Sequence, residues 1–476
     1  MTLLNATAAA HLHTPDVSTS SPNNADPGLS AGPRPDAWGS RLGFILATIG
    51  SAAGIGNIWR FSYVAGENGG GAFLLIYFFA VVLVGLPLVL AELTVGRAAH
   101  RDAVGAYSTL APGTRWHLVG AIAVFAAFLI LAYYAVVAGW ALKYFVGAVD
   151  GSLWASAGEG YGGFFARFIA RPYEPVIWQG IMMAVTVIVV MRGVRRGIEF
   201  ANKILMPLLA LLVLAMAVWG LFQPGAGEGL AFLFAPDWSA LRRSDVYLAA
   251  MGQAFFSLGV GMSIFVTYGG YLSGKQGLSG AAGAIVLGDT AIAILAGVAI
   301  FTTVFAFGHD PAAGPQLAFI TLPQIFLSIP AGKIIGPLFF ALLVAGAITS
   351  MVSILEVPVA FFVRRLRMRR SVVAPAVGFA MFVVGVPASL GFGVWESIAW
   401  QGRGILDTMD FVASNILLPL GGVAVAVFVG WRWTWRRDVP AAQIDGRWLN
   451  TIWLWLLRLV APALILSIMI HAATTL

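Results

Sequence analysis

Long apolar stretches alternate with short polar connections along most of the chain. Eleven of these stretches are long enough to cross a bilayer, which takes roughly 20 apolar residues in a helix. They lie at residues 42–63, 72–95, 118–147, 175–192, 198–222, 246–270, 278–307, 335–363, 372–391, 408–431 and 449–472. The pattern therefore predicts eleven transmembrane helices. The apolar stretch 317–327 is too short to cross and is predicted to form a surface or re-entrant helix.

Composition supports a polytopic membrane protein. Hydrophobic residues make up 59% of the chain and charged residues 10%, whereas soluble domains carry about 25% charged residues. The absence of cysteine excludes disulfides, thiolate metal sites and thiol nucleophiles. No histidine spacing typical of a metal site and no Ser/His/Asp arrangement is found, which disfavours an enzyme.

Basic residues predict the orientation. The net charge of +7 could suit an acidic partner, but the lysines and arginines gather in alternate short loops, as the positive-inside rule requires. The basic loops follow the second, fourth, sixth, eighth and tenth crossings. We therefore predict an integral plasma (inner) membrane protein with a cytoplasmic amino end, an extracellular or periplasmic carboxyl end and no nucleic-acid partner. Residues 1–36 are polar and lack a signal-peptide pattern, which predicts a disordered cytoplasmic tail.

Two of the predicted helices are interrupted by small residues. The first crossing contains GSAAGIGN at residues 50–57, and the sixth contains SLGVG at residues 257–261. Glycine at such spacing also serves helix packing. However, unpaired backbone groups at membrane depth are tolerated only against protein or a cavity. Breaks at the same place in two groups of five helices indicate a transporter site near the bilayer midplane.

The residues around both breaks resemble the neurotransmitter:sodium symporter family, of the bacterial amino-acid transporter type, the group from which the rule on broken helices is partly drawn. The resemblance covers nearly everything after residue 37. Its motifs are RLGFILATIGSAAGIGNIWRF (41–61), ENGGGAF (67–73), GLPLVLAELTVGR (85–97), AYY (132–134), RGVRRGIE (192–199), GQAFFSLGVG (252–261), AITS (347–350) and MDFVASNILLPLGG (409–422).

The resemblance implies an all-α polytopic protein with the LeuT-type fold. Two inverted five-helix repeats, residues 37–222 and 223–431, would carry broken helices one and six, and residues 432–476 would add an eleventh transmembrane helix. The implied function is sodium-coupled secondary active symport, importing a neutral, hydrophobic amino acid by alternating access. Two alternatives stay open at this point: a transporter of an amine that lacks a carboxylate, and a non-transporting amino-acid sensor. The oligomeric state is left open.

The family also implies a substrate pocket at the two breaks. The half-helix beginning near Gly54 would aim free N–H groups and a positive dipole end at a substrate carboxylate, and glycine there leaves room for that carboxylate. Tyr134 would bond the carboxylate and Phe256 would close over the substrate. By resemblance the lining is Ser51, Ala52, Gly54, Gly56, Ile130, Tyr134, Phe256, Ser257, Gly259, Met262, Ser350 and Ile354.

Two sodium sites follow from the same resemblance. The site away from substrate would use carbonyls of Gly50, Ala53 and Gly346 with hydroxyls of Thr349 and Ser350, although these hydroxyls could instead bond their own helix. The site touching substrate would use Ala52, Asn57, Ser257 and Asp289.

Asp289 departs from the family pattern, because most members have asparagine there. Our hypothesis is that its carboxylate supplies the negative charge that chloride supplies in chloride-dependent members. Ala293, one turn later, lacks the hydroxyl or acid usual at the chloride-linked position. Chloride is therefore not expected as a cofactor. Alternatively, Asp289 replaces a missing substrate carboxylate and the cargo is an amine.

Charged residues near the ends of the crossings predict two gates. By resemblance, Arg60 and Asp410 form the outer pair, with Gln253 steadying Arg60. The usual inner pair is altered, and a reversed pair of Asp36 with Arg364 is our hypothesis. Glu92, in the second crossing, would accept bonds from N–H groups freed in helix six; a proton relay is the alternative.

Overall fold

Helices account for the regular structure because an apolar surrounding leaves backbone groups no partners except one another. The computed structural model describes residues 36–272, 277–312, 317–329, 331–433 and 447–474. Apart from two isolated β-bridges, the regular elements in these ranges are all helical. The predicted all-α class is confirmed. The predicted tail at residues 1–36 lies outside the described residues, except for Asp36.

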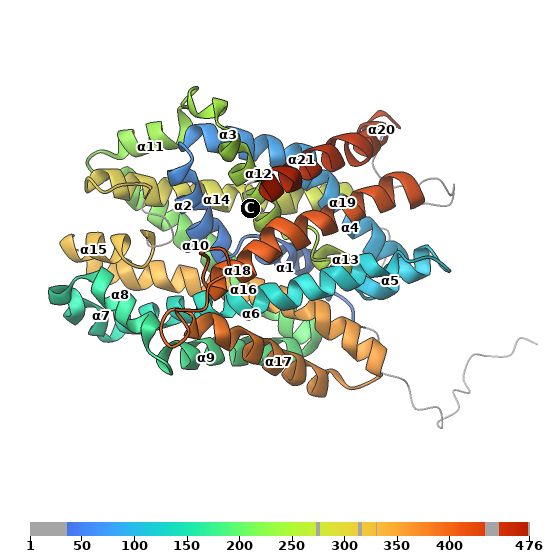
Figure 1. Cartoon of the computed structure of the whole chain (residues 1–476), viewed down its shortest axis with the longest axis horizontal. Helices are drawn as coiled ribbons and strands as arrows, with labels where there is room; N and C mark the ends of the chain where they lie inside the picture. The colour runs from blue at the N-terminus through green and yellow to red at the C-terminus, as the bar shows by residue number, and fades with distance from the viewer. Residues whose placement is uncertain (1–35, 273–276, 313–316, 330, 434–446, 475–476) are drawn as a thin grey trace, which may run out of the picture. The chain divides into compact units, whose positions relative to one another are not determined.

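Nine helical spans in the described residues are long and apolar enough to cross a membrane. They are Gly71–Ala99 (α3, η2 and α4), His117–Asp150 (α6), Glu174–Met191 (α9), Val194–Leu221 (η4 and α10), Leu278–Ala306 (α14), Gly332–Leu366 (α16), Arg370–Leu390 (α17), Ile405–Trp433 (α18, η7, α19 and η8) and Trp448–His471, within α20, η9 and α21 (Figure 1). These spans coincide with nine of the predicted crossings.

The first predicted crossing is a bent pair. Helix α1 (Arg41–Ala52) is followed after a short break by η1 (Gly56–Arg60) and α2 (Phe61–Glu67), and the two parts meet at 48°. With this pair the described chain has up to ten candidate spans. Helix α1 packs against α10 (Phe200–Leu221), α14 and α16, and so lies inside the helix array (Figure 1).

The sixth predicted crossing is divided more completely, into α12 (Ser244–Leu258) and α13 (Ile264–Gly270). Gly259, Gly261 and Ser263, between them, have φ values of 67°, 89° and 56°. These left-handed conformations end a helix and are easiest for glycine. A side chain at Gly261 would also meet the Leu418 carbonyl at 2.5 Å. The chain path and the close neighbour together require glycine in this break.

Shorter helices cover the ends of the spans. They are α5 (Ala103–Leu110), α7 (Ser152–Ala155), η3 (Ser156–Glu159), α8 (Tyr161–Ala170), α11 (Ala226–Phe234), η5 (Ala240–Arg242) and α15 (Thr321–Ser328). Helix α15 falls on the stretch predicted to be a short helix and packs against α16 and α14.

Candidate functional site

The break after α1 leaves room for close contacts with neighbouring helices. A Cβ at Gly54 would collide with the Ser350 hydroxyl of α16, and one at Gly56 would lie 2.7 Å from the Phe256 ring of α12. The Ile55 amide is free of the helix ladder and donates to the Tyr134 hydroxyl of α6 at 3.2 Å. Small residues at the break thus let three other helices reach its backbone.

A small cavity of about 20 Å³ lies at this junction. Eleven of the 12 predicted substrate-pocket residues line it, together with Asn57. The exception is Gly259, which is not in the lining; a Cβ there would meet the Met262 side chain at 3.0 Å. Ile130, Met262 and Ile354 give the cavity an apolar part, whereas the broken backbone and Tyr134 give it a polar part.

A buried polar cluster adjoins the cavity around Asp289. Asn57 donates to its carboxylate at 2.7 Å and to its main-chain carbonyl at 3.0 Å. The Ser257 hydroxyl lies 2.9 and 2.8 Å from the two carboxylate oxygens, and the Tyr77 hydroxyl donates at 3.4 Å. A carboxylate at membrane depth is costly unless it is partnered. Here three polar side chains from three other helices are hydrogen-bond partners of the Asp289 carboxylate, which lowers the cost of burying this residue of α14.

Of the two hydroxyl groups predicted to bind the sodium ion away from substrate, one hydrogen-bonds to another helix and one to its own helix. Ser350 donates to the carbonyls of Gly50 and Ser51, both at 3.4 Å, and so joins α16 to the end of α1. Thr349 instead donates to Gly346 of its own helix at 2.9 Å, which is the alternative left open from the sequence. The Ala53 amide donates the last helical hydrogen bond of α1, to the Ile49 carbonyl at 2.7 Å. The Ala53 carbonyl therefore lies in the break that follows α1.

A larger cavity of about 370 Å³ extends from the site on the side of η1. Arg60, Asp410, Phe256 and Tyr134 all line it, but in the described residues no direct ion pair joins Arg60 to Asp410. Arg60 donates to Gln253 at 2.9 Å and lies over the Phe256 ring at 4.6 Å. Asp410 accepts from Tyr133 at 2.8 Å. Arg60 and Asp410 therefore do not form the predicted direct ion pair, because each bonds a different residue and the cavity lies between them. The predicted contact of Gln253 with Arg60 is present.

The opposite end of the site is closed by aromatic and charged contacts. Trp38 packs edge-on against Tyr268, 5.0 Å between ring centroids, and donates to its carbonyl at 3.0 Å. The predicted pair of Asp36 with Arg364 is wrong. Asp36 contacts Arg370 at 2.6 Å, whereas Arg364 donates to the His100 carbonyl at 3.0 Å.

The turn between α16 and α17 explains why Asp36 meets Arg370 and not Arg364. Arg367 adopts a left-handed conformation, with φ of 54°, and reverses the chain so that Arg370 folds back over α16. Arg370 there forms an ion pair with the fully buried Glu356, which also accepts from Tyr271 at 2.5 Å. Nothing in the local sequence signals this contact, so Glu356 and Arg370 were missed.

Glu92 lies where the resemblance put it, against the second break. One carboxylate oxygen accepts from the Gly261 amide at 2.7 Å. The other has no hydrogen-bond partner among the described residues. The contact suits a brace on the broken helix.

Asn202 of α10 is a further residue that sequence reasoning missed. It is fully buried, and its carbonyl oxygen Oδ1 has no partner within the described residues. That oxygen lies where a side chain on Gly50 would be. The only signal that the sequence offers is an amide side chain beside Lys203 in a mostly apolar helix, five residues after the RGVRRG segment.

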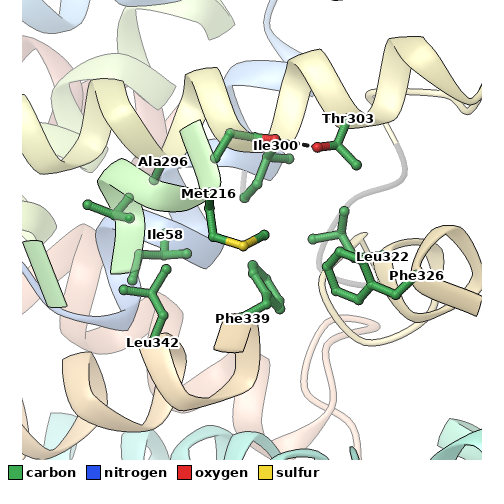
Figure 2. A pocket seen from close by; sticks show the side chains of 11 residues that line it. Ile58, Met216, Ala296, Ile300, Thr303, Leu322, Phe326, Phe339 and Leu342 are labelled. Atoms are coloured by element: carbon green, nitrogen blue, oxygen red, sulfur yellow. Dashed lines mark hydrogen bonds between the residues drawn. The ribbon is translucent and has the colours of Figure 1, made fainter. Parts of the chain in front are cut away.

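A separate hollow on the other side of η1 is apolar. Figure 2 shows Ile58, Met216, Phe339 and Leu342 pointing toward one another across it, with Leu322 and Phe326 of α15 on the far side. Its one hydroxyl, on Thr303, already donates to Ala299 at 2.6 Å. With a volume of about 10 Å³ and no free polar group in its described lining, it is packing space between helices rather than a substrate site.

A family model for the sodium:neurotransmitter symporter family matches residues 35–162 and 175–476. The chain belongs to this family. Among other members, an uncharacterized sodium-dependent transporter of Bacillus subtilis, YhdH, is 37% identical over 442 residues, covering 92% of this chain and 98% of the relative. An uncharacterized sodium-dependent transporter of Haemophilus influenzae is 33% identical, covering 91% and 97%. The symporter is therefore a sodium-dependent membrane transporter and not an enzyme, as predicted.

A solved structure gives the same fold at higher identity. The crystal structure of MhsT in complex with L-phenylalanine is 50% identical to the symporter, with a TM-score of 0.86, and the match covers 92% of this chain and 99% of MhsT. The predicted LeuT-type fold is confirmed.

Proposed function

We propose that the symporter imports a neutral, hydrophobic amino acid together with sodium. The observation that carries the proposal is the division of the cavity into a polar and an apolar part. The Ile55 amide and the Tyr134 hydroxyl meet at the broken backbone, where they can hold a carboxylate. Ile130, Met262 and Ile354 line the other part, which suits an apolar side chain. The L-phenylalanine in the similar MhsT structure supports this cargo class.

An amine without a carboxylate is disfavoured by the partners of Asp289. Its two carboxylate oxygens are engaged by Asn57, Ser257 and Tyr77, so they are directed into the α14 cluster. An amine transporter would need that acid to face the cargo. The ligand set around Asp289 instead suits a sodium ion, because hard cations prefer several oxygen ligands.

The proposal includes two sodium ions and no chloride. One ion would be held by Ala52, Asn57, Ser257 and Asp289, and the other by Gly50, Ala53, Gly346, Thr349 and Ser350. Asp289 would supply a fixed negative charge beside the first ion, which removes the need for a bound anion. Each sodium ion moved inward gains about 2.3 kcal/mol per 100 mV of membrane potential, so two ions can drive uphill accumulation of a zwitterion.

The proposed topology has eleven crossings, with α12 and α13 together forming the sixth, and two inverted repeats over residues 37–222 and 223–431. The amino end would be cytoplasmic and the carboxyl end outside. In that orientation the 370 Å³ cavity opens outward and the Trp38 end is the closed cytoplasmic side. Arg60 and Asp410 would then approach each other when the outer cavity closes, and Asp36 with Arg370 would form the inner gate.

Uptake into proteoliposomes tests the function directly. Purified protein should accumulate radiolabelled hydrophobic amino acids only under an inward sodium gradient, and equally well in chloride and gluconate. Tyr134→Phe should weaken amino-acid binding about tenfold, because it removes one hydrogen bond to a charged group, and should leave any binding of the decarboxylated amine unchanged. Binding without uptake would indicate a sensor, and preference for the amine would overturn the proposed cargo.

A further inference from the structure

Three buried polar groups lie together beside the second break. They are one carboxylate oxygen of Glu92, the hydroxyl of Tyr107 and the hydroxyl of Ser263, and none has a hydrogen-bond partner among the described residues. All three side chains have exposed fractions of 0%. The Tyr107 hydroxyl lies within electrostatic reach of both Glu92 and Ser263. Because buried polar groups in native proteins almost always have a partner, three unpaired oxygens in one place indicate a small polar ligand.

The three groups come from different elements and two of them are fixed by a second contact. Glu92 lies in α4, and its other carboxylate oxygen accepts from the Gly261 amide at 2.7 Å. Tyr107 lies in α5, and its ring packs edge-on against Phe428, 4.9 Å between ring centroids. Helix α5 packs against both α4 and α13. A ligand of these groups would therefore join three elements at the break.

Ser263 is unusual in both its backbone and its side chain. Its φ of 56° lies in the left-handed region that favours glycine, and the other two left-handed residues of the break, Gly259 and Gly261, are glycines. Ser263 is also the N-cap of α13, where a serine side chain commonly accepts from the helix backbone. Here the side chain makes no such bond. The hydroxyl is therefore available to a ligand that lies outside α13.

We propose that one water molecule binds these three groups. The water donates one hydrogen to the free Glu92 oxygen and the other to the Ser263 hydroxyl, and it accepts from the Tyr107 hydroxyl. Buried waters commonly make about three hydrogen bonds, to polar groups that otherwise have no partner. A metal ion suits the cluster less well, because hard cations prefer a larger set of oxygen ligands.

The water would help to position one wall of the substrate cavity. Met262 lines that cavity and lies between Gly261, which Glu92 holds directly, and Ser263, which the water would hold. Tyr107 does not line the cavity, so it acts as a positioning residue through the water. This step rests on the proposed function, whereas the water site itself does not.

A crystal structure of the purified full-length protein, at a resolution that shows ordered water, tests the site directly. We expect an electron-density peak within hydrogen-bond distance of all three oxygens. The peak should be lost in the double variant Tyr107→Phe/Ser263→Ala. A direct hydrogen bond between Tyr107 and Ser263 with no peak beside them would overturn the proposal. So would a peak that the double variant retains unchanged.

Amino-acid binding to the same protein tests the positioning role. Tyr107→Phe and Ser263→Ala should each weaken binding about fivefold, which corresponds to one hydrogen bond. Because both hydroxyls act through one water, the double variant should also be weakened about fivefold rather than about 25-fold. Tyr144→Phe is the matched control, because it removes the hydroxyl of a buried tyrosine that does not line the cavity, and it should bind normally.

Additive losses in the double variant, or an equal loss in Tyr144→Phe, would overturn the positioning role of Tyr107. The density peak does not depend on which cargo the protein carries. A failure of the water site is therefore distinguishable from a failure of the proposed function, which would appear as absent amino-acid binding in the wild type.

Discussion

Replacing Asp289 with asparagine should make sodium binding both weaker and sensitive to chloride. The substitution keeps the shape of the side chain and removes its charge. Asp289 accepts from Asn57 at 2.7 Å and lies 2.8 Å from the Ser257 hydroxyl, and both neighbours are proposed ligands of the same sodium ion. A hydrogen bond to a charged group contributes about 1.5–3 kcal/mol, and loss of the charge beside sodium adds to this. We therefore expect sodium affinity to fall about 10-fold to 150-fold.

The assay is a sodium titration of amino-acid binding to the purified protein, with choline replacing sodium and either chloride or gluconate as the anion. The wild type should give one curve in both anions. Asp289→Asn should give a weaker curve in gluconate and a partial recovery in chloride. Thr303→Val is a suitable control, because its hydroxyl bonds only its own helix α14 at 2.6 Å. Wild-type sodium affinity in gluconate for Asp289→Asn would refute the proposed role of the carboxylate.

Two further substitutions test other parts of the site. Arg370→Gln would leave Glu356 buried without its cation, which costs about 3–5 kcal/mol, and should markedly lower the midpoint temperature of thermal unfolding. Arg364→Gln, the control, should change this midpoint little. Equal midpoints for the two variants would contradict the ion pair of Arg370 with Glu356. Gly54→Ala would push a methyl group into the Ser350 hydroxyl of α16 and should abolish high-affinity amino-acid binding. Gly252→Ala, the control, has open space around its Cβ and should bind the amino acid normally. Unaltered binding by Gly54→Ala would argue against the proposed pocket.

Much of the fold could be predicted because the signals are local. A run of apolar residues reveals a transmembrane helix wherever it lies, and GSAAGIGN and SLGVG interrupt two such runs at positions where the structure has its breaks. The lining of the substrate cavity was predicted from the resemblance to the family, because the motifs that carry the resemblance contain the pocket positions. Gly259 does not line the cavity; it has a left-handed conformation at the end of α12, where the chain leaves the helix direction.

The contacts that could not be predicted depend on chain reversals and on conformation. Arg370 reaches Glu356 only because the chain turns back at Arg367, which residue counting along α16 does not reveal. Arg60 and Asp410 have the right charges for an ion pair, but whether they meet depends on whether the cavity between them is open. A sequence specifies both states of a transporter, whereas a single structure describes one.

The contacts of Trp38 have a consequence for what keeps this end of the protein closed. The ion pair of Asp36 with Arg370 is partly exposed, with 38% of the Asp36 side chain accessible, and such pairs contribute at most about 1 kcal/mol. Losing it would change the open population only about fivefold. Burying an indole removes about 200 Å² from water and contributes about 5 kcal/mol. Trp38 therefore contributes more to keeping this end closed than the Asp36–Arg370 ion pair does.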